Sequence, residues 1–433
     1  MKNIRDFEKT TRPVRVIQFG EGGFLRGFVD WMLQIVNEKT DFDGGVAVVQ
    51  PIKEGLCDLL TAQNCVYTHL CRGCEGVDIK KIDVIEKCIK PYDNFDQYIA
   101  LAENKDFRFI VSNTTESGIA FNSEDKMTDR PASSFPGKLT QLLYKRYELG
   151  LDGFVFLPCE LIDKNGAQLK RCILQYAELW NLGDGFVSWI ENENIFTNTL
   201  VDRINTGYPR GEELELDFDD RMVNTSEYFH LWVIDGYDKL FCEIPFDKCG
   251  LNVILTNELE RYRTRKVRIL NGSHTSMIPY ALLLGVETVG ECLKNDVISA
   301  HLKNCQAEIV DSLDMNRDEA LEYADSVMVR FANPYIQHKC QSIALNSVSK
   351  FKVRVLPSIL QYEEKFAKTP KTLMFSFAKL IDFYRVGTPD DAADVTEKMK
   401  TGTVKEILAD ASLWGQDLSR YADEVESYAD TCK

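Results

Sequence analysis

Short hydrophobic runs alternate with amphipathic segments along the first part of the chain. Residues 14–19 and 46–49 are rich in β-branched side chains and end at turn residues, as buried strands do. Between them, segment 25–37 repeats its apolar residues at helical spacing. The same alternation recurs further along the chain, where strands are expected over 107–111 and 153–157 and a helix is expected over 135–149. Strands that alternate with helices predict an α/β fold with a parallel sheet and right-handed crossovers.

The pattern changes after about residue 189, where helical periodicity begins to dominate. Short strands are expected only between 231 and 257, and from there to the C-terminus the chain is expected to form successive helices. No Ser/Gly-rich linker marks the change. We therefore expect two domains, an α/β domain over 1–200 and a mainly α-helical domain over 201–433.

Composition and charge narrow the range of partners. The chain has 433 residues, of which 44% are hydrophobic and 27% charged, as in a folded globular protein. The 51 Lys and Arg against 67 Asp and Glu give a net charge of −16, which disfavours nucleic acid and anionic membranes as partners. A small anionic substrate stays possible, because a few Arg or Lys can line a cleft within an acidic protein.

The N-terminal residues and the cysteines bear on location. Residues 1–13 are charged and have no apolar core, so a secretory signal is not expected. No apolar stretch approaches the roughly 20 residues that a membrane span needs. The 13 cysteines are scattered without a repeating frame. Reduced thiols in a cytoplasmic protein are the expected state.

A glycine-rich turn follows the first strand directly. In the run 20–27, the first glycine allows a tight turn and the second lets a phosphate approach the backbone. Leu25 occupies the third glycine position of the dinucleotide-binding pattern, so an ordinary strand-to-helix turn is the alternative. The position of the turn favours a dinucleotide site, whose expected residues are Gln18, Phe19, Gly20, Glu21, Gly22, Gly23, Phe24, Leu25 and Arg26.

The end of the second strand departs from the usual dinucleotide pattern. An acidic residue that binds the ribose hydroxyls is expected there, but the sequence has Gln50, with Lys53 close by. An amide can still hydrogen-bond a hydroxyl and does not repel a 2′-phosphate. Gln50 is therefore a candidate cofactor residue, and the choice between NAD and NADP stays open.

The segment 265–274 carries the clearest candidate chemistry. At 100° per residue, Asn271 would lie about 140° and His274 about 80° from Lys266 around a helix, so that all three share one arc. A lysine can exchange a proton with an alcohol oxygen, and an amide can donate a hydrogen bond to it. The alternative is a solvated basic face with Arg263, Arg265 and Arg268, followed by a helix break and a packed histidine.

The glycine turn and the Lys-Asn-His segment, in this order, resemble the mannitol dehydrogenase family of polyol-specific long-chain dehydrogenases. Similar stretches run through nearly the whole chain, at 18–22, 24–26, 28–31, 111–116, 158–163, 165–166, 199–204, 266–267, 269–272, 274–275, 330–331 and 333–336. So long a set is specific for the family. The segment Cys159-Glu160-Leu161-Ile162 lacks the Asn that mannitol-specific members have there, which favours the hexuronate branch.

The resemblance implies a zinc-independent, NAD-dependent oxidoreductase with a Rossmann-type N-terminal domain and a mainly helical catalytic domain. It implies that Lys266 is the general acid/base and that Asn271 and His274 orient the reacting oxygen. It also implies interconversion of tagaturonate and altronate. Arg330 is our candidate for the substrate carboxylate, since a guanidinium fits it bidentately, and a structural ion pair is the alternative. The other expected ligand-binding residues are Asn113 and Thr115 for NAD, and Asp202 and Glu160 for the substrate.

Three alternatives remain open at this point. The first is a related enzyme that acts on fructuronate or on a neutral polyol. The second is a nucleotide-sensing protein without turnover. The third is a zinc site at Cys65, His69, Cys71 and Cys74, although we favour free thiols, because paired CxxC spacing is absent. We expect no metal, and the sequence does not predict an oligomeric state.

Overall fold

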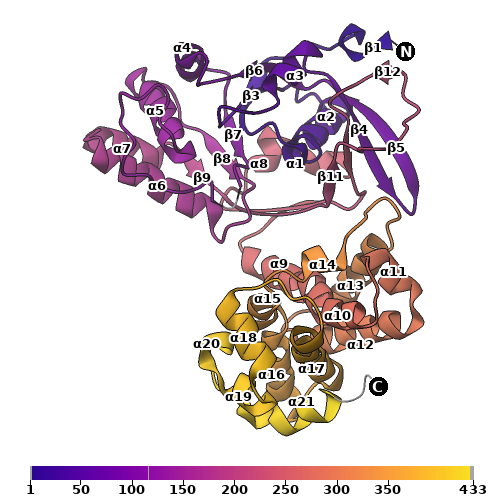
Figure 1. The fold of residues 1–433 in the computed structure, drawn as a ribbon. Helices are drawn as coiled ribbons and strands as arrows, with labels where there is room; N and C mark the ends of the chain where they lie inside the picture. The colour runs from indigo at the N-terminus through magenta and orange to yellow at the C-terminus, as the bar shows by residue number, and fades with distance from the viewer. Residues whose placement is uncertain (1, 116, 430–433) are drawn as a thin grey trace. The chain divides into compact units, whose positions relative to one another are not determined.

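The computed structural model describes residues 2–115 and 117–429 and divides the chain into two compact units, 1–259 and 260–433 (Figure 1). The division follows Leu259 and does not lie near residue 200. The segment after residue 200 belongs to the first unit because β13 (Asn224–Ser226) pairs in parallel with β4 (Tyr67–Gly73). The predicted fold class is confirmed, since unit 1 is α/β and unit 2 is helical.

A six-stranded parallel sheet forms the centre of unit 1. Its order is β6-β3-β2-β7-β8-β9, which is the strand order of a Rossmann fold. The strands are β2 (Val14–Phe19), β3 (Gly45–Val49), β6 (Ile85–Ile89), β7 (Phe109–Ser112), β8 (Val155–Pro158) and β9 (Ile195–Phe196). Four of them lie within two residues of the strands expected from the sequence.

The two faces of this sheet bury separate cores. Successive strand residues point to opposite faces, so Val16 and Val48 enter one core while Ile17 and Val49 enter the other. The second core is covered by the helices on the left of Figure 1. These helices are α4 (Phe95–Ile99), α5 (Phe135–Glu148), α6 (Asn165–Leu179) and α7 (Asp184–Asn192).

Smaller sheets and short helices complete unit 1. The four-stranded sheet has the order β11-β13-β4-β5, with β5 at Gly76–Ile82 and β11 at Asn205–Gly207. The three-stranded sheet contains β10 (Asn198–Asp202), β14 (Leu231–Asp235) and β15 (Val253–Leu255), and β1 (Lys2–Asn3) pairs with β12 (Phe218–Asp219). The helices are α1 (Gly23–Arg26), α2 (Val29–Lys39), α3 (Cys57–Ala62) and α8 (Leu240–Glu243), with 3₁₀ turns at Ile4–Asp6, Ala100–Glu103 and Phe246–Cys249.

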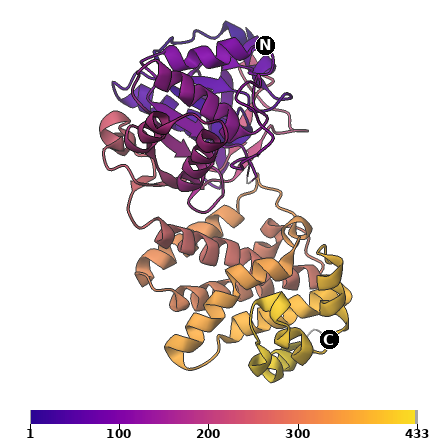
Figure 2. The ribbon, with the colours of Figure 1, turned by 90° about the vertical axis from the view of Figure 1, so that its left-hand side faces the viewer.

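The described part of unit 2 is built of helices, drawn in orange to yellow in Figure 2. Its central helix, α10 (Gly272–Leu283), packs against α12, α14, α15 and α17. The others are α9 (Leu259–Arg265), α11 (Val289–Lys294), α12 (Asp296–Ser312), α13 (Arg317–Phe331), α14 (Cys340–Ile343), α15 (Ser347–Arg354), α16 (Leu356–Phe366), α17 (Lys371–Val386), α18 (Ala393–Thr401), α19 (Val404–Ala409), α20 (Ala411–Trp414) and α21 (Ala422–Ala429), with a 3₁₀ turn at Ser419–Tyr421.

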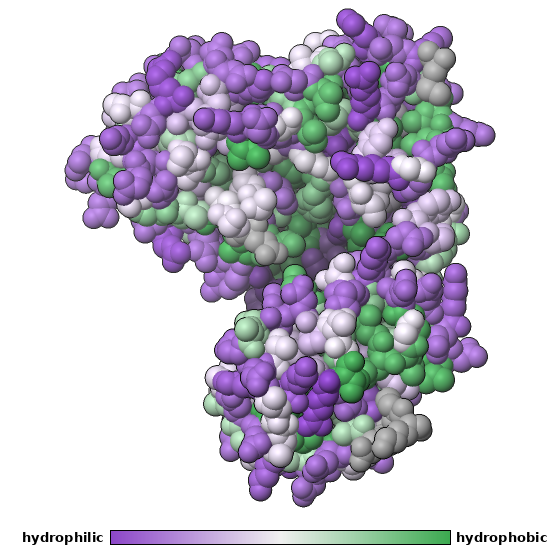
Figure 3. All heavy atoms as spheres, in the orientation of Figure 1, coloured by the Kyte–Doolittle hydropathy of each residue, from purple (hydrophilic) through white to green (hydrophobic). Residues whose placement is uncertain are grey.

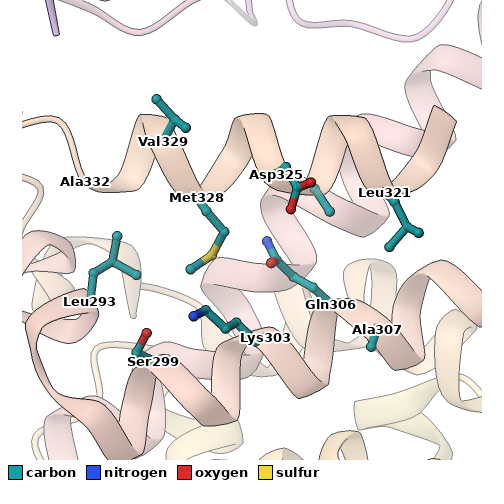
Figure 4. Close-up of a pocket in the computed structure, with 11 residues that line it drawn as sticks. Leu293, Ser299, Lys303, Gln306, Ala307, Leu321, Asp325, Met328, Val329 and Ala332 are labelled. Carbon is teal, nitrogen blue, oxygen red and sulfur yellow. The ribbon is translucent and has the colours of Figure 1, made fainter. Parts of the chain in front are cut away.

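An open groove of about 510 Å³ lies on unit 2 between α12 and α13 (Figure 4). Its lining is largely apolar and includes Leu293, Met328 and Val329, with Lys303, Gln306 and Asp325 as polar members. None of the site residues expected from the sequence lines this groove.

Hydrophilic side chains cover much of the visible surface of both units (Figure 3), in keeping with the net charge of −16. No helix in the described ranges combines the length and apolar character that crossing a bilayer requires.

Candidate active site

The glycine turn lies between the two central strands of the parallel sheet. Gly20 follows β2 with a φ of +116°, which favours glycine, and a Cβ there would lie 3.0 Å from the carbonyl oxygen of Asn113 after β7. A Cβ on Gly22 would meet nothing within 4 Å. The strand order reverses between β2 and β7, and ligands of open α/β sheets bind at such a point. The turn is therefore placed as a nucleotide site requires.

Two further glycines let the turn pack closely on the four-stranded sheet. A Cβ on Gly23 would lie 2.7 Å from Nδ2 of Asn205, and one on Gly27 would lie 2.6 Å from Nδ2 of Asn224. Gly27 also caps the end of α1, so the helix expected over 25–37 is interrupted before α2 begins. Gly23 and Gly27 thus allow the close packing that the usual third glycine provides, and Leu25 does not interfere.

Several side chains of the turn point into the cores of unit 1. Phe19 and Leu25 are each at most 1% exposed. Phe24 packs against the core that contains Leu25 and stacks on Phe28 with ring centroids 5.0 Å apart. Phe19 and Leu25 are therefore placed to offer a cofactor their backbone and not their side chains.

Arg26 is also buried, with 4% of its surface exposed. Its Nε donates to the carbonyl oxygen of Glu21 at 3.1 Å, and a terminal nitrogen donates to the carbonyl oxygen of Met222 at 2.6 Å. The guanidinium therefore fastens the turn to unit 1.

A buried polar cluster supports the turn from beneath. Nε2 of Gln18 donates to the carbonyl oxygen of Gly20 at 3.1 Å and to Oδ2 of Asp30 at 3.3 Å, and the Tyr67 hydroxyl donates to the carbonyl oxygen of Arg26 at 2.7 Å. Burial raises the pKa of Asp30 to about 7. Gln18 is thus placed to hold the turn from within.

At the end of β3, Gln50 occupies the position expected for the ribose acid and is 2% exposed. Its amide nitrogen donates to two carbonyl oxygens of the following loop, and its amide oxygen accepts from the backbone N–H of Cys57. The side chain of Glu21 reaches the same loop, where its Oε1 accepts from the backbone N–H of Leu56 at 3.1 Å.

The end of β7 brings Asn113 next to the glycine turn. Nδ2 of Asn113 donates to the carbonyl oxygen of Cys159 at 2.9 Å, and its backbone N–H donates to the carbonyl oxygen of Phe19 at 3.1 Å. Thr115, two residues further along the chain, has a φ of +80°, in the left-handed region. Asn113 thus lies where the strand order reverses, between β2 and β7.

Glu160 is 3% exposed and is held by the end of β7. Its Oε2 accepts from the Ser112 hydroxyl at 3.0 Å, and its Oε1 accepts from both the N–H and the hydroxyl of Thr114 at 3.0 Å. Burial raises the pKa of Glu160, and these hydrogen bonds lower it. The carboxylate thus orders the β7 end.

Asp202 and Arg203 lie at the end of β10, and both are at most 6% exposed. The Arg203 guanidinium stacks over the Trp31 ring at 4.1 Å and donates to the carbonyl oxygens of Gly27 and Glu227. Arg203 therefore ties the glycine turn to β10.

In unit 2, Lys266 and Asn271 begin and end a π-helical segment, Lys266–Asn271. The expected 140° separation assumed an α-helix. The backbone N–H of Gly272 reaches the carbonyl oxygen of Val267, and in such a wider turn residues five apart lie closer together around the axis than in an α-helix. Single π-turns are frequent at functional sites. The segment thus brings Lys266 and Asn271, both half-buried, closer to one face than expected.

His274 lies one turn further, within α10, and is 7% exposed. Its ring stacks on Phe331 with centroids 4.1 Å apart and meets His338 edge-on at 5.4 Å. Its Nε2 is buried, and within residues 2–115 and 117–429 it has no hydrogen-bond partner. A ligand oxygen can satisfy such an atom.

Nearby cationic side chains act on the pKa of His274. Burial holds the pKa of His274 well below its usual value, and the charges of His338, Arg354, Arg330 and Lys350 lower it further. Its imidazole is therefore neutral at neutral pH, with one nitrogen as donor and the other as acceptor.

The residues of the alternative zinc site, Cys65, His69, Cys71 and Cys74, do not form a metal site in the structure. Both ring nitrogens of His69 lie against polar side chains, with Nε2 2.9 Å from the Ser226 hydroxyl and Nδ1 3.3 Å from Nδ2 of Asn224. Cys65 instead contacts Cys88, with sulfur atoms 3.7 Å apart. In the described part of the chain, no three His, Cys, Asp or Glu side chains are arranged to hold a metal ion.

Two family models cover almost the whole chain. The mannitol dehydrogenase Rossmann domain matches residues 14–246, and the mannitol dehydrogenase C-terminal domain matches residues 258–433. The chain belongs to the mannitol dehydrogenase family. The expected family and the expected oxidoreductase class are thereby confirmed.

Members of the mannitol dehydrogenase family with high similarity are named altronate oxidoreductase. The protein from Yersinia enterocolitica is 42% identical over 96% of this chain and 93% of its own length. That from Phocaeicola vulgatus is 42% identical over 95% of this chain and 92% of its own length.

Two solved structures share the fold. Substrate-free D-sorbitol dehydrogenase has a TM-score of 0.83 at 20% identity, covering 99% of this chain and 93% of its own. Pseudomonas fluorescens mannitol 2-dehydrogenase, in a ternary complex with NAD and D-mannitol, has a TM-score of 0.72 at 19% identity, covering 99% and 92%.

Two cationic side chains that act on the pKa of His274 were not predicted as site residues from the sequence. Lys350 and Arg354, on α15, act on His274 together with Arg330. Their spacing of four residues places both on one face of a helix, a signal that the sequence contained. The distance of 76 residues between His274 and Lys350 hid their proximity.

Proposed function

We propose that this chain is an NAD-dependent oxidoreductase that interconverts tagaturonate and altronate. The proposal joins three supports: a glycine turn at the switch point of a Rossmann sheet, a Lys-Asn-His set on one helix, and positive charge around His274. The similarity to proteins named altronate oxidoreductase supports the same substrate.

The positive charge around His274 carries the choice of a sugar acid over a neutral polyol. Arg330, Lys350 and Arg354 lower the pKa of His274 by their charge, and the first of them is only 5% exposed. Cations attract a carboxylate, which a hexuronate carries and a neutral polyol lacks. Arg330 is the candidate to bind it bidentately, because a guanidinium presents two parallel N–H donors.

The backbone of the glycine turn is the proposed binding site for the NAD pyrophosphate. Gly20 and Gly22 leave room for a close approach, and peptide N–H groups hold phosphate without a cation. Gln50, Asn113 and Thr115 are the further candidates for cofactor contacts. Backbone N–H groups thus allow a chain with a net charge of −16 to bind an anionic cofactor.

Lys266, Asn271 and His274 are the proposed reaction machinery. Bound NADH supplies the hydride that the keto carbon accepts. Lys266 then gives its proton to the keto oxygen as it becomes a hydroxyl, and takes the proton back in the reverse direction. Asn271 donates a hydrogen bond to that oxygen as negative charge develops on it, and the unpartnered Nε2 of His274 bonds a sugar oxygen.

A substrate and cofactor panel tests the proposal. NADH or NADPH oxidation is measured with tagaturonate, fructuronate and fructose. We expect the highest kcat/KM with tagaturonate and NADH, and a value at least about 100-fold lower with fructose, because fructose has no carboxylate for Arg330 to bind. Arg330→Met should narrow the gap between tagaturonate and fructose, whereas Arg317→Met, at an exposed arginine, should leave it unchanged.

Other outcomes of the panel would contradict the proposal in distinct ways. Faster turnover of fructuronate would make the chain a related hexuronate reductase. Equal rates with fructose would remove the role of the cations. Absence of NADH and NADPH oxidation with every substrate would favour a nucleotide-sensing protein.

A further inference from the structure

The end of β3 lacks the carboxylate that distinguishes NAD from NADP in Rossmann folds. That carboxylate binds the ribose 2′-hydroxyl and repels a 2′-phosphate. Gln50 stands in its place, but Nε2 of Gln50 donates to the carbonyl oxygens of Ile52 at 3.0 Å and Lys53 at 2.8 Å. Its Oε1 accepts from the N–H of Cys57 at 3.3 Å. Both amide protons of Gln50 are thus used within the loop.

A carboxylate reaches the same place from the glycine turn. Oε1 of Glu21 accepts from the N–H of Leu56 at 3.1 Å. A Cβ built on Gly55 would lie 2.1 Å from Oε1 of Glu21 and 2.5 Å from Oε1 of Gln50. The ends of the two side chains therefore meet at Gly55, where the loop after β3 passes over the turn.

The surroundings of Glu21 suit a ligand-binding acid. It is 7% exposed, so a charge there is poorly screened by water. Burial raises its pKa, while the N–H of Leu56 and the charge of Arg26 lower it. Lys53, the cation that could hold a 2′-phosphate, has its Nζ over the Tyr92 ring at 5.8 Å.

We propose that Glu21 replaces the missing acid of β3, accepting a hydrogen bond from the adenosine ribose 2′-hydroxyl and excluding a 2′-phosphate. In this proposal, the residue that distinguishes NAD from NADP lies in the glycine turn and not at the end of β3. This inference rests on the proposed function, because it assumes that the dinucleotide lies along the turn.

Binding measurements with the purified full chain test the role of Glu21. Calorimetry with NADH, NADPH, 5′-AMP and 2′,5′-ADP gives four dissociation constants without any turnover. Wild type should prefer NADH over NADPH by at least about 100-fold. Glu21→Gln should weaken NADH about tenfold and strengthen NADPH about tenfold, since a hydrogen bond to a charged group is lost and a repulsion removed. The 5′-AMP and 2′,5′-ADP pair should shift in the same directions.

Two further variants separate charge from packing. Glu54→Gln removes an exposed acid of the same loop and should leave the NADH to NADPH ratio within twofold of wild type. Glu21→Asp keeps the charge on a shorter side chain, so it should bind NADH more weakly yet still exclude NADPH. It also tests the inference if Glu21→Gln does not fold, as judged by its melting curve.

The results distinguish failure of this inference from failure of the proposed function. An unchanged NADH to NADPH ratio in folded Glu21→Gln, or NADPH binding by Glu21→Asp, would overturn the role of Glu21 alone. Wild type that binds none of the four nucleotides would overturn the proposed cofactor and the inference with it.

Discussion

The glycine turn of unit 1 and the Lys266–Asn271 segment of unit 2 use polar side chains in opposite ways. Around the turn, the side chains of Gln18, Arg26 and Gln50 donate hydrogen bonds to backbone carbonyl oxygens. In unit 2, His274 keeps a buried nitrogen without a partner in the described ranges, and cations gather around it. The first region shapes a backbone surface, and the second presents the side chains that we propose take part in the reaction.

This difference reflects what each region has to bind. A pyrophosphate can be held by peptide N–H groups, so side chains are needed mainly to fix the peptide planes. A reacting carbonyl needs a proton donor, and a carboxylate needs a cation, which only side chains supply. Substitutions should therefore affect structure and cofactor binding in unit 1, and turnover in unit 2.

Lys266→Ala should have the largest effect, and it tests whether turnover depends on unit 2 while cofactor binding depends on unit 1. We expect kcat to fall by roughly 10²- to 10⁴-fold, the range that a positioned acid/base contributes. The dissociation constant of NADH should stay within about twofold, because the turn lies in unit 1 and the lysine in unit 2. Steady-state kinetics across pH and calorimetry with NADH provide the two readouts.

Lys303→Ala is the matched control for this prediction. Lys303 is an exposed lysine of unit 2 on α12, so the same substitution there should leave kcat unchanged. Near-normal turnover of Lys266→Ala at every pH would refute the role of Lys266. An equal loss of NADH affinity would mean that the two regions do not divide their tasks as described.

Asp30→Asn tests whether the cluster beneath the turn is structural. Folding raises the pKa of Asp30 from 3.8 to about 7, because the carboxyl is buried. An acid whose pKa rises on folding holds its proton more tightly in the folded state. Its contribution to stability is therefore complete below about pH 4 and is lost as the pH rises through about 7. Asparagine stays neutral and is insensitive to this change.

The variant should gain stability relative to wild type between pH 5 and pH 8. The gain over this interval is at most about 3 kcal/mol, because about two pH units separate pH 5 from the pKa of about 7 and each unit corresponds to about 1.4 kcal/mol. Calorimetric melting of both proteins at the two pH values measures it. A difference in Tm between the two proteins that is the same at pH 5 and pH 8 would mean that Asp30 does not titrate in this window.

The sequence was most informative where local pattern decides structure. The strand at 14–19 and the helix at 135–149 were predicted within a residue, because alternation and helical spacing are local properties. The turn was found because Gly20 must adopt a positive φ directly after a strand. Lys266, Asn271 and His274 were predicted together because they lie within nine residues on continuous helix.

Long-range packing could not be predicted from the sequence. The predicted domain boundary near residue 200 missed the pairing of β13 with β4, whose residues are 155 positions apart at Asn224 and His69. The inward direction of Arg26 depends on the carbonyl of Met222. The meeting of Glu21 with Gln50 depends on a loop that folds back over the turn at Gly55. No periodicity encodes such contacts.

Gln306→Met should give the smallest effect, and it tests whether a buried amide of unit 2 without a hydrogen-bond partner lowers stability. Gln306 lies on α12 with its amide directed toward α13, in the groove of Figure 4. It is 5% exposed, and its Nε2 has no hydrogen-bond partner among the residues described, unlike the Nε2 atoms of Gln18 and Gln50 at the glycine turn. An unsatisfied buried amide is costly, and methionine has a similar volume, so the variant should gain about 1 kcal/mol in free energy of unfolding. Gln416→Met, at an exposed glutamine of the same unit, should show no gain. Denaturant unfolding of the two variants and wild type measures this, and a loss of stability in Gln306→Met would mean that a bound molecule satisfies the amide in solution.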